Sequence, residues 1–381
     1  MSNFIKSDSH YVINGSNLHG GGSLQVATSF ISDLSLNHIN KCRRIHLCIS
    51  KALYENLMSI NVDMSVFASV LRLDFSLRNI IAITRYLSQF KVVFTVIGPA
   101  YLVLLGNTKH VCGFAQPWIC FKEHAKDVDI GYGERCWLWL KFFLQKRFFE
   151  TADLLVVESS DVRAGLLEDG FKSELDVVSN CVAASLYQDS VFTLKKAHRL
   201  GAASTINLGY IGRAYKHKNL QTLKPVIDIL IERYKLDIRL YTTLSEEEID
   251  QVGLRNCEYL INMGPIKSGN LKSFYSKIDF LIFPTLLECF SVSTLEAMSQ
   301  SVIVLASDRP FIRTFCLEHA VYFDPLDIEK IAQKILETID NKEDLPGRAK
   351  DAFEYVMRRP SNKNRTEAYL NLLEPGWCSN D

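Results

Sequence analysis

Residues 283–306 read FPTLLECFSVSTLEAMSQSVIVLA and hold the clearest structural pattern in this 381-residue chain. A strand-like apolar run ends at Pro284, and a helix-like run follows from 294 to 299. Glu288 falls in the loop between the two runs, and Glu296 falls in the first helical turn. In open α/β sheets, ligands bind in the crevice at the carboxyl ends of the strands. The stretch therefore predicts a parallel-sheet domain that directs two carboxylates into this crevice.

Strand-like and helix-like runs alternate through the rest of the chain. The strand-like runs lie at 11–14, 44–49, 91–97 and 154–157, and in the second half at 206–211, 238–241, 280–283, 302–305 and 321–323. Such alternation is typical of parallel sheets with crossover helices, so we predict an α/β fold. Residues 182–204 lack sustained periodicity, which marks a linker between two domains.

Composition narrows the functional class. Lys and Arg (43) balance Asp and Glu (43), so no overall positive field attracts nucleic acid. The ten cysteines form no CxxC pair, which favours free thiols in a reducing cytosol. No signal peptide is recognisable, and the most apolar run, 92–105, is too short to span a bilayer. We predict a cytoplasmic protein, or one peripheral to the cytoplasmic face of a membrane, with no nucleic-acid partner.

Two glycine-containing loops suit a phosphate-bearing ligand. Gly21 and Gly22 precede a helix, where free N–H groups favour anions; an ordinary turn explains them equally well. Gly212 follows the 206–211 strand and is itself followed by Arg213 and Lys218. Arginine offers a planar fork to phosphate oxygens and lysine a point charge, so this loop fits a diphosphate. The alternative is a solvated basic loop.

Two further loops, 98–101 and 113–118, combine glycine, proline and aromatic residues at strand ends. Aromatic rings stack on the apolar face of a pyranose, so Tyr101, Gln116 and Trp118 are candidate walls of a sugar site. Ordinary turns with a packed Trp are the alternative. Asp127 and Asp129 spell the DxD pattern of some metal-dependent transferases, but two acids at this spacing often arise by chance, and we assign no metal ligand.

Residues 134–150, ERCWLWLKFFLQKRFFE, predict a helix that is apolar around most of its girth. A helix of this kind is usually buried in a core. With two Trp and flanking basic residues, it also fits an anionic membrane surface. We favour the buried helix, with part of its basic edge facing lipid.

Taken together, the glycine loop, the Arg213/Lys218 segment and the Glu288/Glu296 pair resemble the family 4 glycosyltransferases, retaining enzymes of the GT-B fold, over nearly the whole chain. The resemblance implies two Rossmann-like domains that face each other across a cleft. Residues 1–185 would bind the acceptor, with Tyr101, Gln116 and Trp118 on the acceptor side. Residues 186–203 would be the linker, 204–360 would bind the nucleotide sugar, and 361–381 would pack back on the first domain.

The resemblance also implies roles for residues. Arg213 and Lys218 would neutralise the donor diphosphate, Glu288 would hold sugar hydroxyls, and Glu296 would hold ribose hydroxyls. The residues implied to contact the donor are Gly21, Gly22, Gly212, Arg213, Lys218, Pro265, Ile266, Glu288, Cys289, Phe290, Ser291, Val292, Ser293 and Glu296.

Two points qualify these roles. Ser293 and Glu296 also spell S-x-x-E, a capping box in which the glutamate only satisfies a helix N-terminus. Many relatives carry glycine where this chain has Cys289 and Ser291, so these side chains must point away from the donor.

The expected activity is metal- and cofactor-independent transfer of a hexose-type sugar from a nucleoside-diphosphate sugar to a glycan or polyprenyl-linked acceptor. Lipopolysaccharide, O-antigen or other surface-polysaccharide synthesis is the expected setting. The alternatives are a non-catalytic GT-B scaffold that binds a sugar nucleotide, and a sugar-nucleotide epimerase of the same fold.

Overall fold

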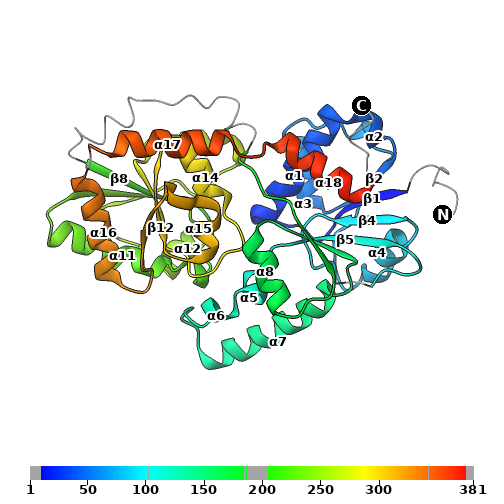
Figure 1. The fold of residues 1–381 in the computed structure, drawn as a ribbon, viewed down its shortest axis with the longest axis horizontal. Helices are drawn as coiled ribbons and strands as arrows, with labels where there is room; N and C mark the ends of the chain where they lie inside the picture. The colour runs from blue at the N-terminus through cyan, green and yellow to red at the C-terminus, as the bar shows by residue number, and fades with distance from the viewer. Residues whose placement is uncertain (1–9, 102, 184–185, 187–204, 342, 375–381) are drawn as a thin grey trace. The chain divides into compact units, whose positions relative to one another are not determined.

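The computed structural model describes residues 10–101, 103–183, 186, 205–341 and 343–374 (Figure 1). The chain divides into two compact units. The first unit contains residues 1–120, 133–180 and 360–381, and the second contains 121–132 and 181–359. These units divide the chain differently from the predicted boundary at 185, because residues 121–132 and 181–183 belong to the second unit. Apart from Leu186, the predicted linker at 186–203 lies outside the described residues.

A seven-stranded parallel sheet forms the centre of the first unit, in the order β3-β2-β1-β4-β5-β6-β7. Its strands are β1 (Tyr11–Gly15), β2 (Ile45–Ile49), β3 (Ser69–Arg72), β4 (Val92–Thr95), β5 (Lys109–Phe114), β6 (Leu154–Val157) and β7 (Glu174–Val177). The helices of this unit are α1 (Gly21–Asn37), α2 (Ile39–Cys42), α3 (Lys51–Ser59), α4 (Ile80–Leu87), α5 (Pro117–Cys120), α7 (Tyr132–Phe149), α8 (Ser160–Glu168) and α18 (Asn362–Leu373), with the 3-10 helix η1 (Met64–Val66).

A six-stranded parallel sheet forms the centre of the second unit, in the order β10-β9-β8-β11-β12-β13. Its strands are β8 (Thr205–Tyr210), β9 (Asp237–Thr242), β10 (Leu260–Asn262), β11 (Phe280–Phe283), β12 (Ile303–Ser307) and β13 (Val321–Phe323). Its helices are α6 (Lys122–Ala125), α11 (Leu223–Glu232), α12 (Glu246–Gln251), α13 (Leu271–Lys277), α14 (Val292–Ser299), α15 (Pro310–Cys316), α16 (Ile328–Asp340) and α17 (Leu345–Met357), with η2 (Lys216–Lys218), η3 (Leu220–Thr222), η4 (Ser268–Asn270) and η5 (Leu317–His319).

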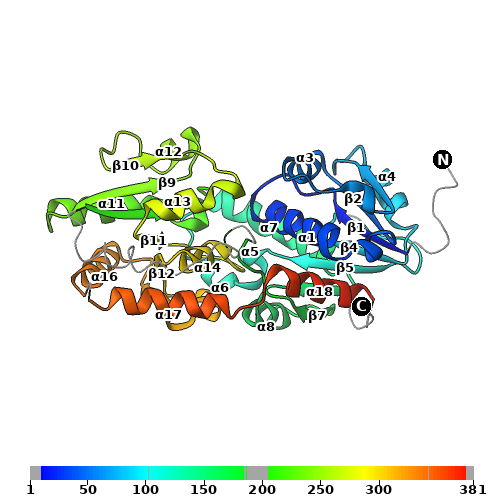
Figure 2. The same ribbon diagram turned by 90° about the horizontal axis from the view of Figure 1, so that it is seen from above.

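Side-chain alternation along the central strands explains why both faces of the second sheet are covered. Phe280 and Ile282 of β11 enter one apolar cluster together with α11 and α16, whereas Leu281 and Phe283 enter another with α13, α14 and α15. Successive residues of a strand point to opposite faces, and a parallel sheet is stable when both faces are buried. Figure 2 labels the helices that surround the strands. The predicted α/β fold with two parallel sheets is confirmed.

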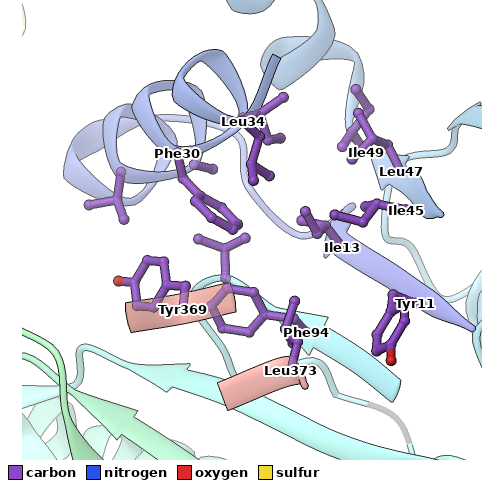
Figure 3. Close-up of a cluster of buried hydrophobic side chains, with 14 of the residues drawn as sticks. Tyr11, Ile13, Phe30, Leu34, Ile45, Leu47, Ile49, Phe94, Tyr369 and Leu373 are labelled. Atoms are coloured by element: carbon purple, nitrogen blue, oxygen red, sulfur yellow. The ribbon is translucent and has the colours of Figure 1, made fainter. Parts of the chain in front are cut away.

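The last helix, α18, is part of the core of the first unit. Tyr369 packs edge-on against Phe30 of α1, with ring centroids 5.1 Å apart, and also contacts Phe94 of β4 at 5.1 Å (Figure 3). Arg365 is buried and donates hydrogen bonds to Asn180 Oδ1 at 2.7 Å and to the Ser29 hydroxyl. Removing this helix would uncover apolar surface and leave buried polar groups unpaired.

The helix α7 does not match the favoured sequence interpretation. Only Gln145 and Phe149 are buried along its length, and most of its large apolar side chains are exposed. The prediction of a buried core helix is therefore wrong. An apolar composition shows that a helix has faces to bury, but whether a partner covers each face depends on the tertiary structure.

Candidate functional site

The candidate donor site lies where two neighbouring strands of the second unit end. β8 leads into the loop that carries Gly212, Arg213 and Lys218, and β11 leads into the loop that carries Glu288. The two strands pair directly in parallel, with Phe280 beside Leu208. In the order β10-β9-β8-β11-β12-β13 the direction of winding reverses between β8 and β11, which makes this the topological switch point where such sheets bind ligands.

Two hydrogen bonds to a single carbonyl oxygen connect the two loops. The carbonyl oxygen of His217 accepts a bond from the Leu286 N–H at 2.8 Å and from the Thr285 hydroxyl at 3.1 Å. Desolvation lowers the pKa of His217 to about 3, so its ring is neutral at physiological pH. Asn219, in the left-handed region at φ 58°, closes the loop by donating from its side chain to the Pro325 carbonyl at 2.9 Å. The backbone around Lys218 is therefore fixed before any ligand binds.

Lys218 and Glu288 form an ion pair between Lys218 Nζ and Glu288 Oε2. The side chains are only 15% and 14% exposed, so bulk water screens the pair weakly. The ammonium also lies 5.3 Å from the centre of the Phe283 ring. The structure therefore brings together two residues that are 70 positions apart in sequence and that sequence reasoning had placed in one site.

Arg213 is held by a residue that sequence reasoning missed. Its Nε donates to Glu248 Oε1 at 2.7 Å, and the Ala214 N–H donates to the same oxygen at 2.9 Å. Burial raises the pKa of Glu248, but hydrogen bonds from the backbone of Ser245 and Ala214 and from Arg213 outweigh this effect and lower it overall. The Arg213 side chain is itself 56% exposed, so its guanidinium can reach a ligand while Glu248 orients it.

A sequence signal for Glu248 did exist. Ser245 and Glu248 form a capping box at the start of α12, in which the Ser245 N–H donates to Glu248 Oε2 at 2.9 Å. The pattern S-x-x-E predicts this cap. The cap pattern does not predict that the second carboxylate oxygen accepts from the Arg213 loop; this contact depends on the pairing of β8 with β9, which brings the loop and α12 together.

Position 212 requires glycine because of its backbone conformation. Its φ of 140° is one that side chains rarely adopt, and a Cβ here would lie 3.0 Å from the Tyr210 hydroxyl oxygen. That hydroxyl donates to the Arg213 carbonyl at 2.9 Å, so displacing it would also disturb Arg213. Glycine therefore allows the chain to turn sharply from β8 into the basic loop.

Glu296 is buried, at 4% exposure, on α14. Its carboxylate accepts a hydrogen bond from the Tyr275 hydroxyl at 3.0 Å. The helix begins after Ser291 rather than Ser293, with no side-chain cap, so the capping-box alternative for Glu296 is wrong. The ribose contact stays a prediction.

Burial of Glu296 gives the second unit a specific pH dependence. Desolvation raises the pKa of Glu296 from its ordinary 4.5 to about 7, so the folded chain holds this proton more tightly than the unfolded chain does. The contribution to stability is fully present below pH 4.5, declines between the two pKa values, and is lost above about pH 7. Across that window the loss amounts to about 3 kcal/mol.

We expect Glu296→Gln to flatten this slope and to be more stable than the parent protein at pH 8. Urea unfolding at several pH values between 4.5 and 8 would measure the effect, with Glu318→Gln, an exposed site, as control. An unchanged slope in Glu296→Gln would show that another group titrates.

The loop after Glu288 turns its side chains inward. Cys289 and Phe290 are buried, and Phe290 packs on Phe315 with ring centroids 4.8 Å apart. The hydroxyl groups of Ser291 and Ser293 are hydrogen-bonded to each other at 2.9 Å. Ser291 immediately precedes α14, and Val292 and Ser293 lie in its first turn. Pro265 and Ile266 follow β10 at the same edge of the sheet, after Gly264 at φ 68°.

The first unit holds the other candidate residues. Gly21 adopts φ 70° at the start of α1, and a Cβ on Gly21 or Gly22 would meet no atom within 4 Å. Tyr101 and Gln116 both hydrogen-bond the side chain of Gln145, the latter at 3.1 Å. Gln145 was missed, because nothing in sequence separates it from other polar positions of α7. Trp118 stacks on Phe142 of α7, with ring centroids 5.4 Å apart.

The DxD pattern does not stand out as a metal site. Asp127 Oδ2 forms an ion pair with Arg309 Nη2 at 2.7 Å, within the second unit. Within the part of the chain that the structure describes, no group of three or more His, Cys, Asp or Glu is arranged to hold a metal ion.

Comparison with known proteins shows similarity to glycosyltransferases. Residues 205–341, which contain the β8 and β11 loops, match the family model of group 1 glycosyl transferases. This match lies entirely within the second unit. A 150-residue segment of the chain is 28% identical to the O-antigen chain mannosyltransferase RfbU of Salmonella typhimurium. That match covers 39% of this chain and 41% of RfbU, less than half of either protein.

Solved structures resemble this chain over almost its full length. Sucrose-phosphate synthase from Thermosynechococcus elongatus superposes with a TM-score of 0.70 at 13% identity, covering 97% of this chain and 100% of that one. Anabaena Alr3699/HepE in complex with UDP-glucose gives 0.70 at 12% identity, covering 96% and 99%. At these identities the likeness establishes the GT-B fold.

Proposed function

We propose that this protein is a retaining glycosyltransferase that moves a hexose-type sugar from a nucleoside-diphosphate sugar to a glycan or polyprenyl-linked glycan, in the synthesis of a surface polysaccharide such as O-antigen at the cytoplasmic face of a membrane. The observation that carries the proposal is the Lys218–Glu288 pair beside Arg213 at the switch point of a group 1 glycosyltransferase domain. The match to an O-antigen mannosyltransferase supports the setting.

The chemistry follows from the charges that change during transfer. The bond between the anomeric carbon and the phosphate oxygen breaks, and negative charge grows on the departing nucleoside diphosphate. Arg213 and Lys218 stabilise this charge, and positive groups that are already in place do so at little reorganisation cost. The acceptor oxygen bonds the anomeric carbon on the same face, and its proton passes to the departing phosphate. Glu288, oriented by Lys218, holds sugar hydroxyls and favours the cationic sugar.

Transfer by the purified protein tests the proposal. We expect release of nucleoside diphosphate from one member of a panel of UDP-, GDP- and dTDP-hexoses, only when a lipid-linked acceptor is present. Glu288→Ala should abolish release without unfolding the protein, and Glu337→Gln, a half-exposed site on α16, should behave as the parent. Wild-type turnover by the Glu288→Ala variant would show that Glu288 is not part of the active site. Conversion of donor without acceptor would favour the epimerase, and donor binding without turnover would favour the scaffold.

We also propose that transfer needs no divalent metal, because two cationic side chains already flank the predicted diphosphate position. Activity should then persist after the protein is dialysed against EDTA and assayed in its presence. Loss of activity with EDTA, restored by Mg²⁺ or Mn²⁺, would contradict this expectation and direct attention back to Asp127 and Asp129.

A further inference from the structure

The outer face of α7 is an exposed apolar surface that the candidate site does not explain. We define this face by five side chains with exposed fractions between 41% and 69%: Trp137 59%, Trp139 69%, Leu140 50%, Phe143 41% and Leu144 50%. Positions 139 and 143, and 140 and 144, are four residues apart, so they lie on one side of the helix. α7 can be followed in Figure 1 as one long helix. Contiguous exposed apolar surface of this kind marks an interaction site.

The charges around this face indicate what covers it. α7 carries four basic residues, Arg135, Lys141, Lys146 and Arg147, against one acid, Glu134 in its first turn. Lys146 is only 19% exposed and pairs with Asp169 at 2.7 Å, so the other three supply the charge next to this face. The Lys141 ammonium lies 5.2 Å from the Trp137 ring, and the Arg147 guanidinium lies 5.1 Å from the Phe143 ring while also pairing with Glu150. Cations therefore lie directly beside the apolar side chains.

We propose that the outer face of α7 docks the protein onto a membrane surface rich in anionic lipid. In the headgroup region the rings of Trp and Phe reach the acyl boundary, while lysine and arginine keep their charges hydrated next to lipid phosphates. Trp139 and Phe143 stack at 5.6 Å and present one flat aromatic surface for this purpose. A second copy of the chain fits less well, since a symmetric α7–α7 contact would bring like charges together.

The helix lies along the membrane surface rather than across it. Its 18 residues span about 27 Å, but charged side chains interrupt its apolar sequence. In the described part of the chain, no helix has the length and hydropathy needed to cross a bilayer. Since the protein has no net charge at pH 7, attraction to an anionic surface has to come from a local patch of this kind.

On its opposite side, α7 contacts the residues predicted to lie on the acceptor side. Gln145 donates to the Tyr101 hydroxyl and accepts from Gln116, and Phe142 stacks on Trp118. These are the candidate acceptor residues, so a docked α7 would hold them within about one helix diameter, roughly 10 Å, of the headgroups. This last step rests on the proposed function, because it assumes an acceptor with a lipid anchor.

Vesicle flotation of the full chain tests the docking directly. We expect binding to phosphatidylcholine vesicles that contain phosphatidylglycerol, weaker binding to phosphatidylcholine alone, and release by salt. The double variant Trp139→Ser/Phe143→Ser should lower the affinity about tenfold or more, because both rings leave the interface. Lys141→Gln/Arg147→Gln should reduce binding to the anionic vesicles only. Leu36→Ser and Leu167→Ser, exposed leucines on α1 and α8, serve as matched controls and should bind as the parent.

Several outcomes would overturn the proposal. It fails if the parent protein does not float with anionic vesicles, or if the aromatic double variant floats equally well. It also fails if α7 variants instead abolish a dimer seen by sedimentation in the absence of lipid. Transfer to a water-soluble acceptor analogue separates this proposal from the proposed function: the aromatic double variant should keep that activity and lose transfer to acceptors embedded in vesicles. Absence of transfer to both acceptors by the parent would instead contradict the proposed function.

Discussion

Lys218→Met is expected to abolish sugar transfer and to destabilise the second unit at the same time. The Glu288 carboxylate is 14% exposed and would lose its cationic partner inside a poorly hydrated site. Removing one partner of a buried pair typically costs about 3–5 kcal/mol. The proposed diphosphate site would also lose one of its two cations, and the loss of one such group typically lowers kcat by about 10²–10³-fold.

The double variant Lys218→Met/Glu288→Gln separates the two effects. With both charges removed no unpaired ion remains, so most of the stability should return while transfer stays absent. Urea unfolding and nucleoside diphosphate release measure the two quantities. Arg233→Met, which breaks the exposed Arg233–Glu329 pair, is the matched control and should change neither. Near-parental transfer by Lys218→Met would exclude Lys218 from the site, and unchanged stability would show that Glu288 finds another partner.

The parallel sheets were predictable because their central strands are buried on both faces. β1, β2, β6, β11 and β12 are short runs in which every residue is buried, so sequence shows them as apolar blocks. Strands β3, β7 and β10 were missed. They lie at sheet edges, where most or all of their residues are partly or fully exposed and no apolar run arises.

The candidate site was predictable to the extent that it follows from strand ends. Parallel strands terminate at one edge, so a loop after β8 and a loop after β11 had to be neighbours, and the Lys218–Glu288 pair follows. Glu248 and Gln145 were not predictable as site residues. Each acts through contacts with another loop or helix, and periodicity within one segment contains no information about such neighbours. The same reason explains why the predicted burial of α7 was wrong.

Glu248→Ala is expected to weaken donor binding more than it slows transfer. Glu248 makes no predicted contact with the donor; it holds Arg213 and the Ala214 N–H, and is therefore a positioning residue. Without it, the loop after Gly212 loses one of its anchors, and Arg213 has to be ordered when the donor binds. Hydrogen bonds to charged groups contribute about 1.5–3 kcal/mol, so the KM for the donor should rise about tenfold or more. An interaction made equally in the ground and transition states changes KM and leaves kcat nearly constant.

A split between KM and kcat distinguishes positioning from a merely structural role. If Glu248 only capped α12, its loss would lower the unfolding midpoint while the remaining folded protein bound donor normally. Glu248→Gln retains a carbonyl oxygen that can still accept from Arg213 or Ala214, so it should recover part of the donor affinity. Glu247→Ala changes the neighbouring acid of the same helical turn, which bonds Ser245 but not Arg213, and should leave the donor KM unchanged. An equal rise in KM for Glu247→Ala would place the effect in the helix rather than in the Arg213 contact.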